Sequence, residues 1–224
     1  MKRQKLSERI LPDYTKGEEI FNMTSHIVGG ALGIIATVLC VVFAAKHHNT
    51  YGVVSSAIYG ASMIILYTFS SIYHGLSPRL TAKKVFQIID HCSIFLLIAG
   101  TYTPIALCSL REYNPTLGWV IFGVVWAAAV VGITFNSIDL KSFRIFSAIC
   151  YFLMGWCIIF AWKPTAQMLT PTGTLFLLLG GAAYTVGALF YYFLKHTRYM
   201  HSVFHLFVFL GSLMHFFCIL LYVV

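Results

Sequence analysis

The sequence predicts an all-α integral membrane protein that forms a seven-transmembrane helix bundle. Three observations support this fold class. The chain of 224 residues is 59% hydrophobic, only 10% of its residues are charged, and its apolar residues gather into seven long stretches. A soluble domain usually carries about 25% charged residues. The mean hydropathy of +0.82 therefore indicates a chain that lies mostly in lipid.

Each apolar stretch has about 20 residues, the length that an α-helix needs to cross the hydrocarbon core of a bilayer. Backbone polar groups in lipid must be paired within their own segment, so we expect each stretch to be helical. In chain order the stretches cover residues 27–45, 51–73, 85–110, 116–137, 145–162, 171–194 and 202–224.

The connecting segments are short and polar, so nearly the whole chain is expected to cross the membrane. We expect a cytoplasmic N-terminal segment at residues 1–25 and a seven-helix transmembrane domain at residues 26–224. The polar stretch before the first span is too long for the basic start of a secretory signal. No cleavable signal peptide is therefore expected.

Some residues within the spans predict details of packing. Pro104 interrupts the third stretch midway and should disturb its helix. Gly29 and Gly33 should allow another helix to approach the first one closely. All six cysteines fall in apolar stretches without a Cys-x-x-Cys pair, so we expect buried thiols and neither a disulfide framework nor a thiolate metal site.

The basic charge of the chain predicts its orientation. The formal net charge is +8, and twelve of the 15 Lys and Arg residues fall on one side of the predicted topology. These twelve are Lys2, Arg3, Lys5, Arg9, Lys16, Arg79, Lys83, Lys84, Lys141, Arg144, Lys195 and Arg198, and the other side has Lys46, Arg111 and Lys163. Such an excess marks the cytoplasmic face. We therefore predict a multi-pass protein of the inner (plasma) membrane, with its N-terminus cytoplasmic, its C-terminus outside, membrane lipids as partners and no nucleic acid partner.

On this topology, polar side chains from four distant segments share one depth near the cytoplasmic face. They lie where the first span begins, where the second ends, and where the third and seventh begin. The residues are His26, Ser70 and His74, Asp90 and His91, and His201 and His205.

The spacing of His201 and His205 predicts a metal site. The two residues are one helical turn apart, about 6 Å at about 1.5 Å per residue, so both imidazoles can reach one point. By itself the pair could simply cap a helix end. His74 at the same depth favours metal binding, because three histidines with one open position form a typical catalytic zinc site. We predict zinc as the cofactor, with His74, His201 and His205 as its ligands.

Asp90 and Ser70 are the predicted catalytic residues. Asp90 is the only acid within an apolar stretch, where a charge costs at least about 2.5–3.5 kcal/mol and therefore suggests function. It would act as a general base or hold a water molecule at the metal; pairing with Lys84 at the interface is the alternative. Ser70 could hydrogen-bond a substrate oxygen or that water, or it could bond its own helix backbone.

Two further histidines are expected to have other roles. His215 lies about 15 Å deeper than His205 and cannot share the metal, so we expect a neutral core residue or one that lines a cavity. His91 neighbours Asp90 but points about 100° away around the helix, which favours a supporting role.

Together, these motifs resemble those of the hemolysin III family, the bacterial branch of the progestin and adipoQ receptor superfamily. The resemblance covers essentially the whole chain. It rests on Glu19, Asn22 and His26 in EIFNMTSH, Ser70 and His74 in SSIYH, Asp90 and His91 in DHCSIFLLIAGTYTP, and His201 and His205 in HSVFH. The resemblance implies a zinc bound by three histidines on the cytoplasmic side, with Asp90 reaching it through water. A similarity to alkaline ceramidases implies hydrolysis of lipid amides.

Two classes of function remain open at this point. One is a zinc-dependent hydrolase that acts on lipid amides or esters, a lipid-like substrate, and affects membrane lipid homeostasis. The other is a non-enzymatic membrane regulator, pore or cytolysin with a structural metal site. The histidines and Asp90 favour the hydrolase. The substrate, the oligomeric state and the roles of Glu19, Asn22 and His26 are left open by the sequence.

The charge distribution gives a testable topology. A reporter fused after Val224 should be active only in the periplasm or outside the cell, and one fused at Met1 only in the cytoplasm, because Lys and Arg are retained inside. Alkaline phosphatase and green fluorescent protein fusions would measure this. A cytoplasmic C-terminal reporter would contradict both the span count and the shared depth of the histidines.

Overall fold

The computed structural model describes residues 6–194 and 196–224. The basic residues Lys2, Arg3, Lys5 and Lys195, used above to predict orientation, lie outside this part of the chain. All regular secondary structure of the described residues is helical. The long helices are α1 (Lys16–Lys46), α2 (Thr50–Gly75), α3 (Thr81–Pro104), α5 (Pro115–Asp139), α6 (Arg144–Trp156), α8 (Pro171–Leu194) and α9 (Met200–Tyr222).

Short helical segments complete two of the spans. In the third span, α3 continues through the π-helix η2 (Ile105–Leu110) into α4 (Arg111–Tyr113). In the fifth span, α6 continues through the 3₁₀-helix η3 (Cys157–Ala161) into α7 (Trp162–Met168). A separate 3₁₀ turn, η1 (Leu6–Glu8), precedes α1. With these continuations, seven described helices are long and apolar enough to cross a membrane, which confirms the predicted span count.

The first helix begins earlier than hydropathy predicts. It starts at Lys16, where Thr15 is the N-cap and forms a capping box with Glu18. The Thr15 side chain accepts a hydrogen bond from the Glu18 N–H, while the Glu18 carboxylate accepts one from the Thr15 N–H. Helix α1 therefore crosses the predicted boundary between the N-terminal segment (residues 1–25) and the transmembrane domain (residues 26–224). Where the membrane itself begins along α1 stays a prediction.

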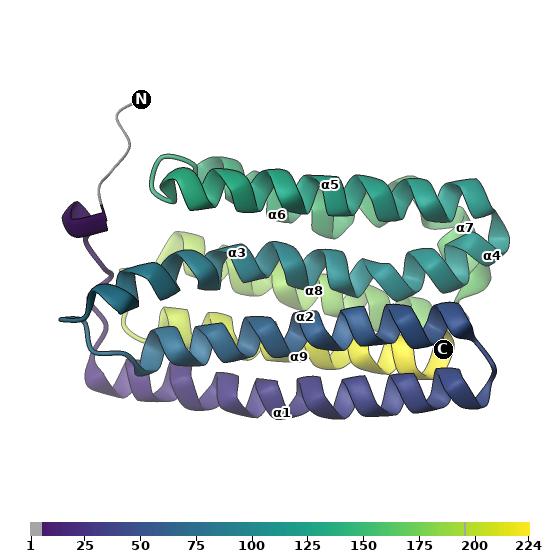
Figure 1. Cartoon of the computed structure of the whole chain (residues 1–224), viewed down its shortest axis with the longest axis horizontal. Coiled ribbons are helices and arrows are strands. Elements are labelled where there is room, and N and C mark those ends of the chain that lie inside the picture. Colours follow the sequence, from purple (N-terminus) through teal and green to yellow (C-terminus); the bar gives the residue numbers. More distant parts are fainter. Residues whose placement is uncertain (1–5, 195) are drawn as a thin grey trace.

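The helices lie side by side along the long axis of the molecule (Figure 1). Helix α1 packs against α2 and α9, α8 packs against α9, and α3 packs against both α2 and α5. The third span, Thr81–Tyr113, is central, because 83% of its most apolar part is buried, against 22–50% in the other spans. The described chain begins and ends at opposite ends of the bundle (Figure 1). Which end faces the cytoplasm stays a prediction.

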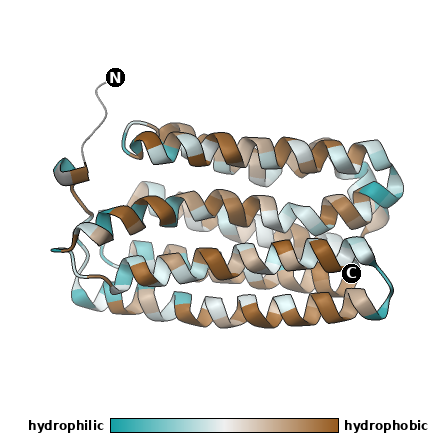
Figure 2. Cartoon of the chain, viewed as in Figure 1, coloured by the Kyte–Doolittle hydropathy of each residue, from teal (hydrophilic) through white to brown (hydrophobic). Residues whose placement is uncertain are grey.

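The outer surface of the bundle is apolar along most of its length. Hydrophobic residues cover the middle of the helices, and hydrophilic ones gather toward the ends and loops (Figure 2). Large apolar side chains such as Ile27, Val130 and Leu153 are more than half exposed on α1, α5 and α6. Apolar surface of this extent needs a lipid environment. The chain is therefore a multi-pass membrane protein.

Glycines bring α1 and α2 together, as predicted. A Cβ atom at Gly29 would overlap the ring of Tyr67, and one at Gly33 would lie 3.1–3.3 Å from atoms of Ile64 and Met63. The backbone of α1 therefore lies in close contact with side chains of α2 at both glycines. All six cysteines are free. Four are buried as predicted, whereas Cys150 and Cys157 are only partly buried.

The predicted interruption at Pro104 is confirmed, because the α-helical pattern changes to a π-helix directly after it. A neighbouring interruption in the fifth span was not predicted. There the Tyr102 hydroxyl accepts a hydrogen bond from the Ile158 N–H at 3.0 Å and donates one to the Gly155 carbonyl at 2.8 Å. The Tyr102 hydroxyl thus replaces hydrogen-bond partners that the backbone loses where the α-helix is interrupted. Backbone groups at membrane depth need such partners within the protein, because lipid offers none.

Candidate metal centre

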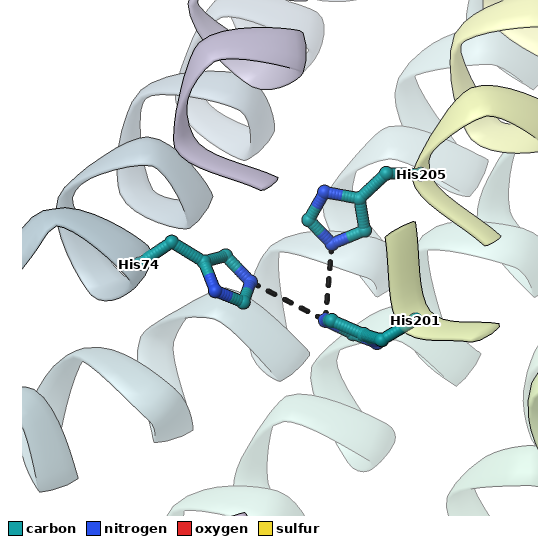
Figure 3. A group of neighbouring side chains, drawn as sticks. All are labelled: His74, His201 and His205. Atoms are coloured by element: carbon teal, nitrogen blue, oxygen red, sulfur yellow. Dashed lines mark hydrogen bonds between the residues drawn. The ribbon is translucent and has the colours of Figure 1, made fainter. Parts of the chain in front are cut away.

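Three histidines converge at one end of the bundle (Figure 3). His74 lies in the last turn of α2, and His201 and His205 lie in the first turns of α9. The Nε2 atom of His201 is 3.3 Å from that of His74 and 3.1 Å from that of His205. The structure therefore brings together the three residues that the sequence predicts as metal ligands.

The spacing of these nitrogen atoms fits a tetrahedral metal ion. Zinc–nitrogen bonds of about 2.0–2.1 Å at tetrahedral angles place two ligand nitrogens about 3.3–3.4 Å apart. One potential ligand atom from each of the three histidines lies within 4.8 Å of the others. Imidazole nitrogens suit zinc and several other transition metals. The cluster can therefore hold a metal ion and leave one tetrahedral position for another ligand.

Glu19 orients His74 for this role. The Nδ1–H of His74 donates a hydrogen bond of 2.6 Å to Oε2 of Glu19 on α1. A proton on Nδ1 leaves the lone pair of Nε2 free, and it is Nε2 that faces His201. Metal-binding histidines commonly donate their other ring N–H to a carboxylate in this way. The sequence leaves the role of Glu19 open, and the structure places it behind a candidate ligand.

Lys83 holds the second oxygen of Glu19. Its Nζ atom donates to Oε1 of Glu19 at 2.8 Å and to the backbone carbonyl of Leu76, just beyond α2, at 2.9 Å. Lys83 is 1% exposed, and lysines are rarely so buried unless paired. The charge pattern of the sequence predicts Lys83 only as a loop residue, because nothing in its spacing indicates burial. The ion pair fixes Glu19 between α2 and α3.

Tyr14 covers the histidine cluster from the segment before α1. Its ring is stacked on His201 with centroids 5.0 Å apart and planes 13° apart. Desolvation by burial, together with the neighbouring phenol of Tyr191, raises the pKa of Tyr14, so its hydroxyl stays neutral near pH 7. Glu18 secures this segment by accepting a hydrogen bond of 2.7 Å from the Tyr199 N–H at the start of α9. No sequence pattern pointed to Tyr14.

His26 is a fourth histidine in contact with the cluster. Its ring is stacked on that of His205, with centroids 3.7 Å apart and an angle of 21° between the planes. Imidazole lone pairs lie in the ring plane, so two nearly parallel rings cannot direct their nitrogens to the same ion. His26 therefore supports His205 from the side and is not part of the group that can hold a metal.

Asp90, on α3, does not belong to the group of potential ligands. Its side chain is 13% exposed, and Oδ2 is 3.8 Å from Nδ1 of His91. Its catalytic role stays a prediction.

The Ser70 hydroxyl is buried and makes no hydrogen bond. The alternative in which it bonds its own helix backbone is therefore not what the structure shows. Ser71, the next residue, does make such a bond, to the Tyr67 carbonyl at 2.7 Å. Ser70 thus keeps its hydrogen-bonding capacity for another group, and its catalytic role stays a prediction.

His215 and His91, which the sequence assigns other roles, do not belong to the group of potential ligands. The Nε2–H of His215 donates a hydrogen bond to the Leu177 carbonyl at 3.1 Å, and its ring lines a cavity of about 30 Å³ with Tyr102 and Trp156. This agrees with the expectation of a cavity-lining residue. The Nδ1–H of His91 donates to the Gln87 carbonyl of its own helix at 2.9 Å.

The fold and the site define a class: a seven-helix membrane protein with a histidine triad able to hold a metal, in which His74 and His205 are buried and His201 is partly buried. Residues 14–216 match the family described as Haemolysin-III related, and the chain belongs to this family. It is 43% identical to Hemolysin-3 of Bacillus cereus over 207 residues, which are 92% of each chain. It is 40% identical to the Hemolysin-3 homolog of Bacillus subtilis (strain 168) over 211 residues, 94% of this chain and 97% of that one.

A more distant relative supports the wider superfamily. The chain is 24% identical to the human Monocyte to macrophage differentiation factor over 170 residues, which are 74% of this chain and 69% of the relative. The resemblance to hemolysin III proteins and to the progestin and adipoQ receptor superfamily is thereby confirmed.

The contact between Glu19 and His74 can be tested by metal titration. Glu19→Gln should weaken metal binding about 10–100-fold, because the neutral amide no longer fixes the His74 tautomer or offsets Lys83. Competition with a chromogenic chelator would measure the affinity of the purified protein. Glu112→Gln, an exposed change beyond η2, is the matched control and should bind like the parent protein. Equal affinities in all three proteins would contradict this role of Glu19.

Proposed function

We propose that the chain is a membrane-embedded zinc-dependent hydrolase of lipid amides or esters that affects membrane lipid homeostasis. The observation that carries the proposal is the convergence of three histidine Nε2 atoms at tetrahedral spacing, with Glu19 orienting one of them. The cluster is surrounded by membrane-spanning helices, so a lipid is the most accessible substrate. The charge distribution supports a location in the inner (plasma) membrane with the site toward the cytoplasm.

Zinc is the proposed metal because the donor set consists of three imidazoles and resembles that of catalytic zinc sites. A zinc ion held there would act as a Lewis acid on a substrate carbonyl and make water a stronger nucleophile at neutral pH. His74, His201 and His205 would hold it. Glu19 and Lys83 would keep His74 in the required tautomer.

Asp90 and Ser70 supply the remaining chemistry in this proposal. A carboxylate oxygen of Asp90 accepts a proton from the attacking water and later returns it to the leaving nitrogen or oxygen. The Ser70 O–H donates to the carbonyl oxygen of the substrate as negative charge develops there. Support comes from the unpaired Ser70 hydroxyl and from the largely buried carboxylate of Asp90, whose side chain is 13% exposed.

A non-enzymatic role is the second candidate, and one observation favours it. The triad joins α2 to α9, and Glu19 adds α1, so a metal there would brace the last helix of the chain against the first two. In this case the metal would be structural and the protein a membrane regulator, pore or cytolysin. Two relatives carry the name hemolysin.

The metal content of ligand variants tests the proposed site. Purified protein should contain about one zinc per chain, and the double variant His201→Ala, His205→Ala should lose it, because one histidine cannot close the site. Inductively coupled plasma mass spectrometry would measure the ratio. His215→Ala removes a buried histidine outside the triad and should retain zinc. Stoichiometric zinc in the double variant would show that the metal site lies elsewhere.

The Asp90→Asn variant tests catalysis. It should retain zinc but lose about 10²–10⁴-fold in hydrolysis, because an amide cannot accept the proton of water. Ser70→Ala should lose about 10²–10³-fold if its hydroxyl stabilises the developing oxyanion. Release of fatty acid from lipids in nanodiscs would measure turnover, with zinc content determined in parallel.

Two results of this assay would count against the hydrolase. Unchanged turnover in Asp90→Asn would remove the general-base role. No turnover over a broad panel of lipid amides and esters, with a cellular effect that survives loss of the metal site, would favour the non-enzymatic role.

A further inference from the structure

The chain before α1 runs across the end of the bundle at which the triad lies. At its start, η1 packs against α3. At its end, the Tyr14 ring is stacked on that of His201 of α9 and has its centroid 5.8 Å from that of His74 on α2. Residues 9–15, the pre-α1 segment, therefore lead from α3 to α2 and α9 where α1 and α3 begin (Figure 1).

Tyr14 lies on the outer side of the triad. His201 is the second residue of α9 and stands one turn nearer the helix end than His205. The Tyr14 ring covers one face of His201, and the ring of Tyr191 on α8 has its centroid 5.2 Å from that of His201. Since Tyr14 precedes all the spans, its ring stands between the triad and the water at this end of the bundle.

The base of the pre-α1 segment is firmly held. The carboxylate of Glu18, which is buried, accepts hydrogen bonds from the Thr15 N–H at 2.8 Å and the Tyr199 N–H at 2.7 Å. Tyr199 has a φ of 62°, a left-handed conformation that is uncommon outside glycine. A Cβ atom at Gly17 would lie 2.8 Å from the Tyr199 hydroxyl, so α1 begins in close contact with the start of α9. This junction can serve as a hinge.

The rest of the segment is held only by surface contacts at its α9 side. Residues 9–15 have no regular secondary structure. Arg198 donates to the Asp13 carbonyl at 3.1 Å and pairs with its carboxylate at 3.9 Å, but the two side chains are 57% and 98% exposed. Exposed ion pairs contribute little to stability. Segments with few buried contacts open locally without unfolding of the whole protein. The segment can therefore lift while the helices stay in place.

We propose that the pre-α1 segment is a lid that closes the triad to water and to dissolved metal ions, with Tyr14 as the closing side chain and Arg198 as the latch. The lid sets how fast a metal ion enters and leaves, and not how tightly it is held. The reason is that stacking on a ring face leaves the in-plane lone pair of His201 free for the metal. The lid applies equally to a catalytic and to a structural metal, so it does not depend on the proposed hydrolysis.

Chemical modification of histidines tests the lid without any metal. Metal-free protein in nanodiscs is treated with diethyl pyrocarbonate, and mass spectrometry of its peptides gives the reaction rate at each histidine. In Tyr14→Ala the rate at His201 should rise about 3–10-fold, as expected from the loss of one aromatic contact that keeps the lid closed. The exposed His196 should react equally in both proteins, and the buried His215 should stay unreactive.

Matched variants separate the lid from a general effect of substitution. Arg198→Ala removes the latch and should raise the His201 rate about 2–5-fold, the range for an exposed ion pair. Tyr113→Ala beyond η2 and Arg79→Ala between α2 and α3 also remove exposed side chains, and both should leave the rate unchanged.

Three results of this labelling would count against the assignments. An unchanged rate at His201 in Tyr14→Ala would overturn the lid. Equal rises at His201 and His215 would overturn it as well, because Tyr14 would then stabilise the bundle as a whole. An unchanged rate in Arg198→Ala alone would remove the latch.

Zinc exchange tests the consequence for the metal. In Tyr14→Ala, zinc uptake by metal-free protein and zinc release to excess chelator should both accelerate about 3–10-fold, while the Kd stays within about 2-fold, because a lid acts on passage in both directions. A weaker affinity with an unchanged uptake rate would show that Tyr14 only supports His201 and would overturn the lid. Lid-dependent labelling in a protein that binds no zinc would contradict the proposed metal site and leave the lid in place.

Discussion

The hydrogen bond between Glu19 and His74 is the interaction on which the candidate site depends. It joins α1 to α2 at 2.6 Å, and the second Glu19 oxygen joins Lys83 of α3 at 2.8 Å. Charges withdrawn from water need partners with good geometry, and removing one partner leaves the other uncompensated. The three helices must therefore keep their relative depth for Glu19 to remain paired. The same depth brings His74 to the two histidines of α9 and so defines where a metal can bind.

A second constraint comes from lipid, which offers no hydrogen bonds to the backbone. Two spans nevertheless depart from regular α-helix, at Ile105–Leu110 and Cys157–Ala161. Tyr102 connects them by bonding to the backbone around Ile158. Near the triad the situation is reversed, because Asn22, His26 and Ser70 retain unpaired polar atoms in a buried place.

Much of this architecture follows from sequence patterns alone. The seven apolar stretches predict the seven spans because the length of a span is set by bilayer thickness. The His-x-x-x-His spacing predicts two imidazoles on one face because helical geometry is local. Boundaries were less predictable: α1 begins at Lys16 within polar sequence, where a capping box extends the helix beyond its apolar stretch. Hydropathy reports which residues tolerate lipid, whereas helix ends depend on capping.

The sequence by itself determined the membrane class, the number of spans, the family and the set of histidines from which a metal site can be built. Only the tertiary structure decided which partners these residues have. It placed Lys83 in the interior, set Glu19 behind His74, stacked His26 on His205 and laid Tyr14 over His201. The physical reason is that composition and periodicity are local properties of one helix. Contacts between helices depend on their rotation and relative depth, which the packing of all seven spans determines together.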